Sequence, residues 1–201
     1  MQVAELRGAS WRLLLAWAVL SLLGYVAGER LIALLRPALA VTLQQIAPAL
    51  TGPLDLTDHR GERHLRFNAQ AAQALTLGAD LVVPAGQPLP ASASIAHLLV
   101  PLVMLGTALT GWPIRHRAER WRRALWGLPA MLFILLATAP AQLVGLIEMS
   151  LQTYADGHGA DRSPPLVLGW MLLLEGGGRW VLPIAVAVLV ILAARAGQGR
   201  R

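Results

Sequence analysis

Residues 124–147, ALWGLPAMLFILLATAPAQLVGLI, decide the fold, because none of these 24 residues is charged. A helix of that length is about 36 Å long, which is more than the roughly 30 Å of hydrocarbon in a bilayer. We therefore predict a transmembrane helix here. Pro129 and Pro140 are compatible with it, since neighbouring groups in a membrane protein can satisfy the carbonyls that a proline frees.

The composition of the whole chain indicates lipid as its main solvent. Apolar residues make up 56% of the 201 residues and charged residues 14%, against about 25% charged residues in soluble domains. Mean hydropathy is +0.55. A soluble domain of this length would need more polar surface, so we expect an integral membrane protein.

The charged residues are biased in type. All 17 basic residues are Arg, the formal net charge is +6, and there is no Cys. The use of Arg alone, with many Ala, Leu and Gly, is typical of a GC-rich bacterial genome. The absence of Cys excludes disulfides, thiol catalysis and a Cys-ligated metal. Because the Arg residues lie at the ends of apolar runs, we expect contacts with membrane lipids and none with nucleic acid.

Three more apolar runs predict three more membrane helices, at residues 11–35, 95–114 and 166–194. The predicted fold is therefore mainly α, with about four transmembrane helices, one in residues 1–36 and three in residues 95–201. The first run could instead be a signal peptide that ends near Val26-Ala27-Gly28. Apolar residues resume directly after this point, and the resulting length favours an uncleaved anchor.

Arginine placement predicts the orientation in the membrane. Residues 115–123, between the second and third predicted helices, contain five Arg in nine residues, and short loops this basic stay in the cytoplasm. We therefore expect a bacterial inner membrane protein with both termini in the cytoplasm. Tryptophan is enriched at membrane interfaces, and four tryptophans fall near the same predicted boundary: Trp11, Trp112, Trp121 and Trp126.

Residues 37–94 are then predicted to be extracytoplasmic. Residues 38–50 have helical spacing, and they could continue the first helix or lie along the membrane interface. The period then changes to strand-like alternation at residues 54–57 and 64–67. The turn signal Asp58-His59-Arg60-Gly61 lies between these two runs, so they predict a β-hairpin.

A second hairpin is predicted by Leu75-Thr76-Leu77, a turn at Gly78-Ala79, and Leu81-Val82-Val83. Residues 84–90, PAGQPLP, follow it, and we interpret them as a stiff linker into the second membrane helix. So small a β-unit buries little apolar surface by itself. We expect it to rest on the membrane helices or on a partner.

Five charged residues lie in or near the predicted helices, at a similar depth toward the outer leaflet: Glu29, Arg30, Glu148, Glu175 and Arg179. A charge in hydrocarbon is costly, so such residues are usually paired and often functional. Glu175 and Arg179 are four residues apart, which places them on one helix face. The five residues form either a polar functional cluster or, in a structural interpretation, contacts with lipid headgroups and a salt bridge.

Gly176-Gly177-Gly178 interrupt the fourth run, at a cost of about 1 kcal/mol per Gly relative to Ala in a helix. The run is about 43 Å long as a helix, so it protrudes, tilts or bends at the glycines. Close helix packing accounts for them. A broken helix would fit a transporter, but that interpretation needs a matching interruption in the other half of the chain, where none is visible.

The sequence contains none of the short motifs of nucleotide sites, metalloproteases or serine hydrolases. Two His-containing stretches, residues 58–64 and 156–161, have no recognised ligand spacing, and we interpret them as solvated loops. We therefore predict no catalytic residue, no cofactor and no metal.

The layout comprises one helix, an outer β-rich segment, a helical hairpin with a basic inner turn, and a last helix with a glycine-rich start. Its short motifs are Leu98-Leu99-Val100-Pro101-Leu102, Leu136-Ala137-Thr138-Ala139-Pro140 and Gly178-Arg179-Trp180-Val181-Leu182-Pro183. In these features the chain resembles the small accessory membrane proteins encoded beside exosortases. The resemblance covers the architecture of the whole chain, and it implies a role beside a machine that sorts exported proteins at the cell envelope. An exosortase itself would need a catalytic Cys, which this chain lacks.

The expected function is that of a non-catalytic accessory or scaffold protein in envelope protein sorting or assembly. In this role it would dock another integral membrane protein. One alternative is a membrane enzyme with a polar site of Glu148, Glu175 and Arg179 at the outer leaflet. A transporter subunit is a further alternative, although four helices are few for a pore unless the chain oligomerises.

Overall fold

The computed structural model describes residues 3–78, 81–114 and 116–196. The chain forms two compact units. We call residues 1–28, 99–135 and 177–201 the helical unit, and residues 29–98 and 136–176 the sheet unit. Ala79 and Arg115, which belong to segments interpreted from the sequence, lie outside the described ranges, as do Arg200 and Arg201.

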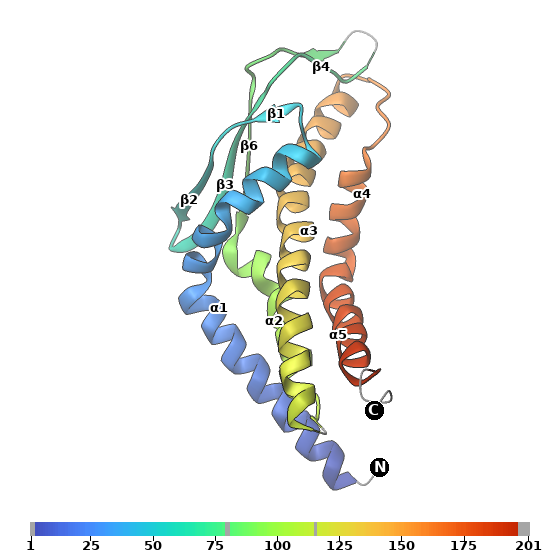
Figure 1. Cartoon of the computed structure of the whole chain (residues 1–201). Helices are drawn as coiled ribbons and strands as arrows, with labels where there is room; N and C mark the ends of the chain where they lie inside the picture. The colour runs from blue at the N-terminus through green and yellow to red at the C-terminus, as the bar shows by residue number, and fades with distance from the viewer. Residues whose placement is uncertain (1–2, 79–80, 115, 197–201) are drawn as a thin grey trace. The chain divides into compact units, whose positions relative to one another are not determined.

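Most of the described chain is helical (Figure 1). The helices are α1 (Val3–Ile46), α2 (Ile95–Gly111), α3 (Arg117–Gly157), α4 (Leu166–Leu173) and α5 (Arg179–Ala196).

Within the described ranges, three helical stretches are long and apolar enough to cross a membrane: Ser10–Ile46, Arg117–Gly157 and Leu166–Ala196. A mainly helical fold with apolar helices of membrane-spanning length and a small sheet is thereby confirmed. The fourth expected helix, α2, is apolar but has 17 residues, which is the lower limit for crossing the hydrocarbon.

Helix α1 continues to Ile46, past the boundary expected at residue 36. The reason is a second apolar stripe after Gly28. Ile32, Leu39 and Leu43 are buried, and their spacing of seven and four residues defines one face of a helix. This half of α1 contributes to the core of the sheet unit. In contrast, only 11% of the most apolar 18-residue stretch of α1 is buried.

Helix α3 is longer than predicted at both ends. It begins at Arg117, so most of the basic loop expected at residues 115–123 is helical. Glu119 in the first turn suits the positive end of the helix dipole. At the other end α3 continues to Gly157. Leu151 and Ala155 extend the buried face there at helical spacing.

The interruption of the fourth apolar run is present as a kink. Between α4 and α5 lies η1 (Leu174–Gly178), in which Gly177 has φ of +117° and ψ of −9°. Residues other than glycine rarely adopt such a backbone conformation. Of the three expectations for this run, the bend at the glycines is the one observed. The expectation of close helix packing was wrong for Gly176 and Gly177, because a Cβ added at either would have nothing within 4 Å.

The central strand of the sheet unit is β3 (Glu62–Ala71). On one side it pairs with β6 (Pro88–Ser94), and on the other with β2 (Leu54–His59) and the short β1 (Leu50–Thr51), all antiparallel (Figure 1). Leu65, Phe67, Ala69 and Ala71 of β3 are buried and alternate with more exposed residues. One face of the sheet thus belongs to the core and the other is polar.

The first predicted hairpin is confirmed, with Leu54 opposite Phe67 and His59 opposite Glu62. Its turn residues Arg60 and Gly61 have φ of +56° and +82°, as in the type I′ turns that match the twist of a hairpin. The second predicted pair is present as β4 (Leu75–Thr76) and β5 (Val82–Val83).

The prediction of a linker at residues 84–90 was wrong in its second half. Pro88, Leu89 and Pro90 begin strand β6, which pairs with β3 from Pro88 to Ser94. Proline is compatible with an edge strand wherever its missing N–H would have pointed away from the sheet. Its presence therefore did not exclude a strand here.

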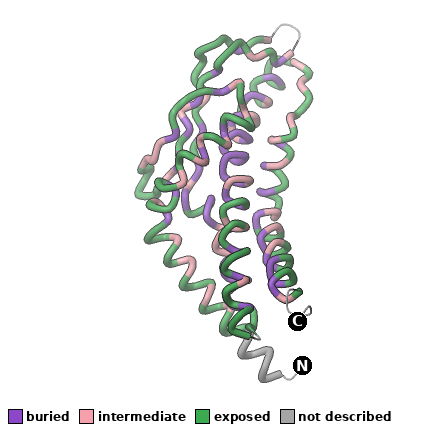
Figure 2. The backbone as a smooth tube through the Cα atoms, viewed as in Figure 1, coloured by how far each residue is buried: buried purple, intermediate pink, exposed green. Residues whose placement is uncertain are grey.

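The helical unit has an apolar core from α2, α3 and α5: Leu105, Leu109, Ile134, Ala187, Val190 and Ile191 are buried together. Figure 2 shows buried positions along one side of α5 and exposed positions along the other. Exposed apolar side chains are extensive, as expected for helices whose solvent is lipid.

One buried ion cluster lies in the helical unit. Glu119 is fully buried; it pairs with Arg123 and accepts a hydrogen bond from Arg195 Nε at 2.9 Å. Arg123 also donates to the carbonyls of Leu109 and Trp112, at 3.2 and 2.9 Å. Carbonyls at a helix end lack intrahelical donors. The cluster therefore joins three helix ends: the end of α2, the start of α3 and the end of α5.

Glycine positions test the close packing of α3 and α4 in the sheet unit. A Cβ on Gly145 would lie 2.5 Å from Met171 Cβ, whereas one on Gly169 would have nothing within 4 Å. Gly145→Ala should destabilise the protein by about 1–3 kcal/mol through overpacking and lower its Tm in detergent. Gly169→Ala should leave the Tm unchanged or raise it, because Ala favours a helix by about 1 kcal/mol. Equal changes in Tm for the two variants would contradict the close approach of α3 and α4.

The buried ion cluster gives a second prediction. Arg123→Met removes the buried partner of Glu119 and the donor to the carbonyls at the end of α2, so it should cost about 3 kcal/mol or more. Arg120→Met is the matched control, because Arg120 is exposed on the same part of α3. Thermal unfolding and gel filtration in detergent would compare the two. Similar Tm values would show that the cluster does not stabilise the fold.

Candidate functional site

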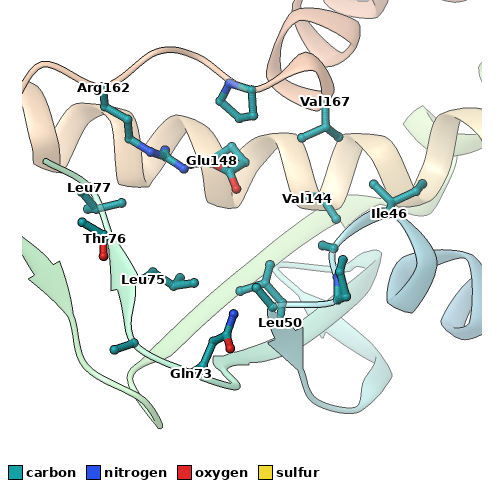
Figure 3. Close-up of a pocket in the computed structure, with 15 residues that line it drawn as sticks. Ile46, Leu50, Gln73, Leu75, Thr76, Leu77, Val144, Glu148, Arg162 and Val167 are labelled. Carbon is teal, nitrogen blue, oxygen red and sulfur yellow. Dashed lines mark hydrogen bonds and ion pairs between the residues drawn. The ribbon is translucent and has the colours of Figure 1, made fainter.

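A pocket of about 370 Å³ opens in the sheet unit near the end of α1 (Figure 3). Its walls come from residues 46–50, residues 73–77, α3 and residues 162–167. Most lining side chains are apolar, among them Ile46, Leu50, Val144 and Val167. Pockets for small ligands have this character, with a few polar groups in a mostly apolar wall.

The pocket wall contains one ion pair. Arg162 Nη2 donates a hydrogen bond to Glu148 Oε2 at 2.6 Å, and Figure 3 shows the guanidinium and the carboxylate pointing toward one another. Only 18% and 16% of these side chains are exposed. Arg162 Nη1 is also buried, but no acceptor for it occurs among the described residues. The pair therefore presents a buried cationic donor with unused hydrogen-bonding capacity.

The chain path brings Arg162 to Glu148. Helix α3 ends at Gly157, Gly159 takes a φ of +67°, and α4 begins at Leu166, so the intervening segment turns back along α3. Gln152 lies one turn after Glu148 and donates to the Arg162 carbonyl at 3.1 Å. This bond fixes the backbone of the returning segment, which positions the guanidinium over the carboxylate.

A second polar group of the sheet unit contains Glu175. Its Oε1 accepts a hydrogen bond from Gln142 Nε2 at 3.1 Å and lies 3.5 Å from His97 Nε2. His97 is in the first turn of α2, and Gln142 is on α3. Nearby on α4, Trp170 Nε1 donates to the Ala137 carbonyl at 3.1 Å. These contacts join the first turn of α2, α3, α4 and η1 within the unit.

The five charged residues proposed as a cluster are divided among different surroundings. Glu29 Oε2 lies 3.4 Å from Arg63 Nε, and both side chains are exposed. Arg30 is exposed. Arg179 is buried and belongs to the helical unit. Of the five, Glu148 alone contributes to the pocket wall.

Sequence reasoning missed Arg162, Arg63 and Gln142. Arg162 lies in a polar segment without periodicity, and it contacts a residue 14 positions earlier. One signal was present, since two apolar helices joined by a short loop form an antiparallel hairpin. In such a hairpin the residues after the loop face those before it.

No group of three or more His, Asp or Glu within the described ranges could hold a metal ion. The sequence matches no protein-family model, and no curated protein and no solved structure matches it. The pocket is therefore interpreted from its own geometry: an apolar wall, one ion pair and one buried donor.

A double-mutant cycle tests the ion pair. Glu148→Gln and Arg162→Gln each leave one largely buried charge without its partner, so each should cost about 1–3 kcal/mol. The double variant should cost less than the sum, because two neutral amides can hydrogen-bond to each other. Unfolding in detergent would measure the coupling. The exposed pair Glu29 and Arg63 is the control, and its cycle should show little coupling. Additive costs at Glu148 and Arg162 would contradict an energetic pair.

Proposed function

We propose that this protein is a non-catalytic accessory subunit of the bacterial inner membrane, whose sheet binds an extended segment of a partner membrane protein. The proposed setting is protein sorting or assembly at the cell envelope, which rests on the resemblance to accessory proteins encoded beside exosortases. The observation that carries the docking proposal is the open edge of strand β2.

Strand β2 pairs with β3 on one side and with no other described strand. Asn68 N donates to the Pro53 carbonyl at 3.0 Å, which places Pro53, and then every second residue, in hydrogen-bonded pairs with β3. The N–H and C=O groups of Leu54, Leu56 and Asp58 therefore point away from the sheet. Such a row of main-chain groups is a template for strand addition.

The opposite edge of the sheet, strand β6, is less suited to strand addition. Ala71 N donates to the Gln87 carbonyl at 3.1 Å, and β6 continues opposite β3 from Pro88. By the same alternation, Leu89 points its main-chain groups toward β3, whereas Pro88 and Pro90 occupy two of the outward positions and Ser92 and Ser94 the other two. Proline has no N–H, so this edge offers fewer donors to an added strand. The two edges thus differ, and β2 is the one suited to a partner.

We further propose four spans, with both termini in the cytoplasm and the sheet outside it. The apolar helices and the arginines of residues 115–123 support this topology. The four tryptophans assigned to the inner interface all belong to the helical unit and are exposed, as interfacial tryptophans should be. The exposed apolar surface of α1 would contact lipid or the membrane domain of the partner.

The outward N–H of Asp58 provides a test. With a photocrosslinking amino acid in place of Thr57, the protein should form a discrete crosslink to one partner in intact cells. Asp58→Pro removes the outward donor and should reduce the crosslink about fivefold, the equivalent of one hydrogen bond. Asp58→Ala is the matched control. It removes the same side chain, whose Oδ1 accepts from Gly61 N, but keeps the N–H.

Equal yields from the Asp58→Pro and Asp58→Ala variants would contradict strand addition. Extraction in mild detergent as a stable monomer, with no crosslink at Thr57, would contradict the accessory role as a whole. Turnover of a membrane substrate by the purified protein, lost in Glu148→Gln, would favour the enzyme alternative instead.

A further inference from the structure

We infer that the pocket beside Glu148 and Arg162 binds an amphiphile that combines one apolar chain with an oxyanion, either a phosphate or a carboxylate. The inference goes beyond the proposed function. None of the residues that line the pocket belongs to β2, and the ligand is a membrane component and not a protein.

The position of the pocket along the helices favours a ligand from the membrane surface. Helix α1 ends in the pocket wall at Ile46, and the apolar stretch Leu166–Ala196 begins there, next to Pro165. On α3 the uncharged run ends at Ile147, between the lining residues Val144 and Glu148. Helix α3 and the stretch that begins at Leu166 therefore both change from apolar to polar sequence at the pocket. That change marks the depth at which lipid headgroups meet their chains.

The polar wall fits an oxyanion. The guanidinium has five N–H donors in a fixed plane, and Glu148 accepts from Nη2. Nη1 is buried, and no described atom accepts from it. A phosphate or carboxylate oxygen forms strong charge-assisted bonds with such a group. Figure 3 shows the Gln73 side chain turned toward the same space, where its amide can donate a further bond.

The remaining wall fits an apolar chain. Ile46, Leu50, Leu75, Val144 and Val167 line the pocket opposite or beside the ion pair. Burial of methylene groups against these side chains is favourable in proportion to the area removed from water. A volume of about 370 Å³ lies at the small end of the range for ligand pockets. It suits one chain segment with its headgroup and not a whole two-chain lipid.

The binding experiment uses the full-length protein in an uncharged detergent. Oleate, oleoyl lysophosphatidic acid and monoolein would be titrated separately, and native mass spectrometry would count the bound molecules. We expect one saturable site for an anionic probe, at least about tenfold tighter than for monoolein, since tenfold corresponds to one charge-assisted hydrogen bond. Preference for the lysophosphatidic acid would identify a phosphate ligand, and preference for oleate a carboxylate. Non-saturable binding, or equal binding of monoolein, would overturn the inference.

Two variants should change the affinity in opposite directions. Arg162→Gln should reduce anion binding about tenfold, to the level of monoolein, because the cationic donor is lost. Glu148→Gln should raise anion binding about tenfold, because it removes a competing negative charge next to the ligand. A merely structural ion pair would not give opposite signs. Weaker binding in Glu148→Gln would overturn the inference.

Two further variants cover the case in which Arg162→Gln does not fold. Val167→Trp fills the pocket but keeps the ion pair, so it should abolish saturable binding of both anionic probes. Arg63→Gln removes an exposed arginine outside the pocket and should bind as the wild type does. Unchanged binding in Val167→Trp would overturn the inference. None of these measurements involves a partner protein, so their failure would be distinct from failure of the proposed docking at β2.

Discussion

The pairing of charges that are withdrawn from water governs this structure. Helix α3 carries Glu119 near its start and Glu148 further along. Glu119 pairs with Arg123 on α3 itself and with Arg195 on α5, and Glu148 pairs with Arg162 from the segment after α3. A buried carboxylate without a partner is very costly. These pairs therefore link α3 to the segments that supply Arg195 and Arg162. The last turn of α5 is held at one end, and the segment that leads into α4 is held at the other.

The elements that could be predicted from the sequence are those whose structure depends on local residues and not on tertiary contacts. The uncharged run on α3, the hairpin around Arg60 and Gly61, and the kink at Gly177 follow from local physics: burial in lipid, turn geometry and backbone freedom. The boundaries depended on tertiary contacts instead. Helix α1 extends to Ile46 because the apolar residues of its second stripe are buried in the core of the sheet unit. Strand β6 includes two prolines because its other residues can pair with β3.

The candidate site was predictable only in part. The position of Glu148, at the point where an uncharged run ends, marked it as a residue near the membrane boundary. Its partner Arg162 depends on how the loop after Gly157 folds back, and that path is set by contacts such as the bond from Gln152. Hydropathy gave similar depths to Glu29, Glu148 and Glu175. Depth says nothing about direction around a helix axis, which is why their contacts differ.

The two outward prolines of β6 limit how large an assembly through this sheet can become. If the strand that joins β2 came from a second copy, pairing β2 against β2, the outer edges of the joined sheet would both be β6. Pro88 and Pro90 would then face outward at each side, and neither edge would recruit a third copy well. Association through this sheet would therefore favour two chains over a propagating fibre. A sheet held at high local density on a membrane surface benefits from such a stop, because unprotected edges aggregate there most readily.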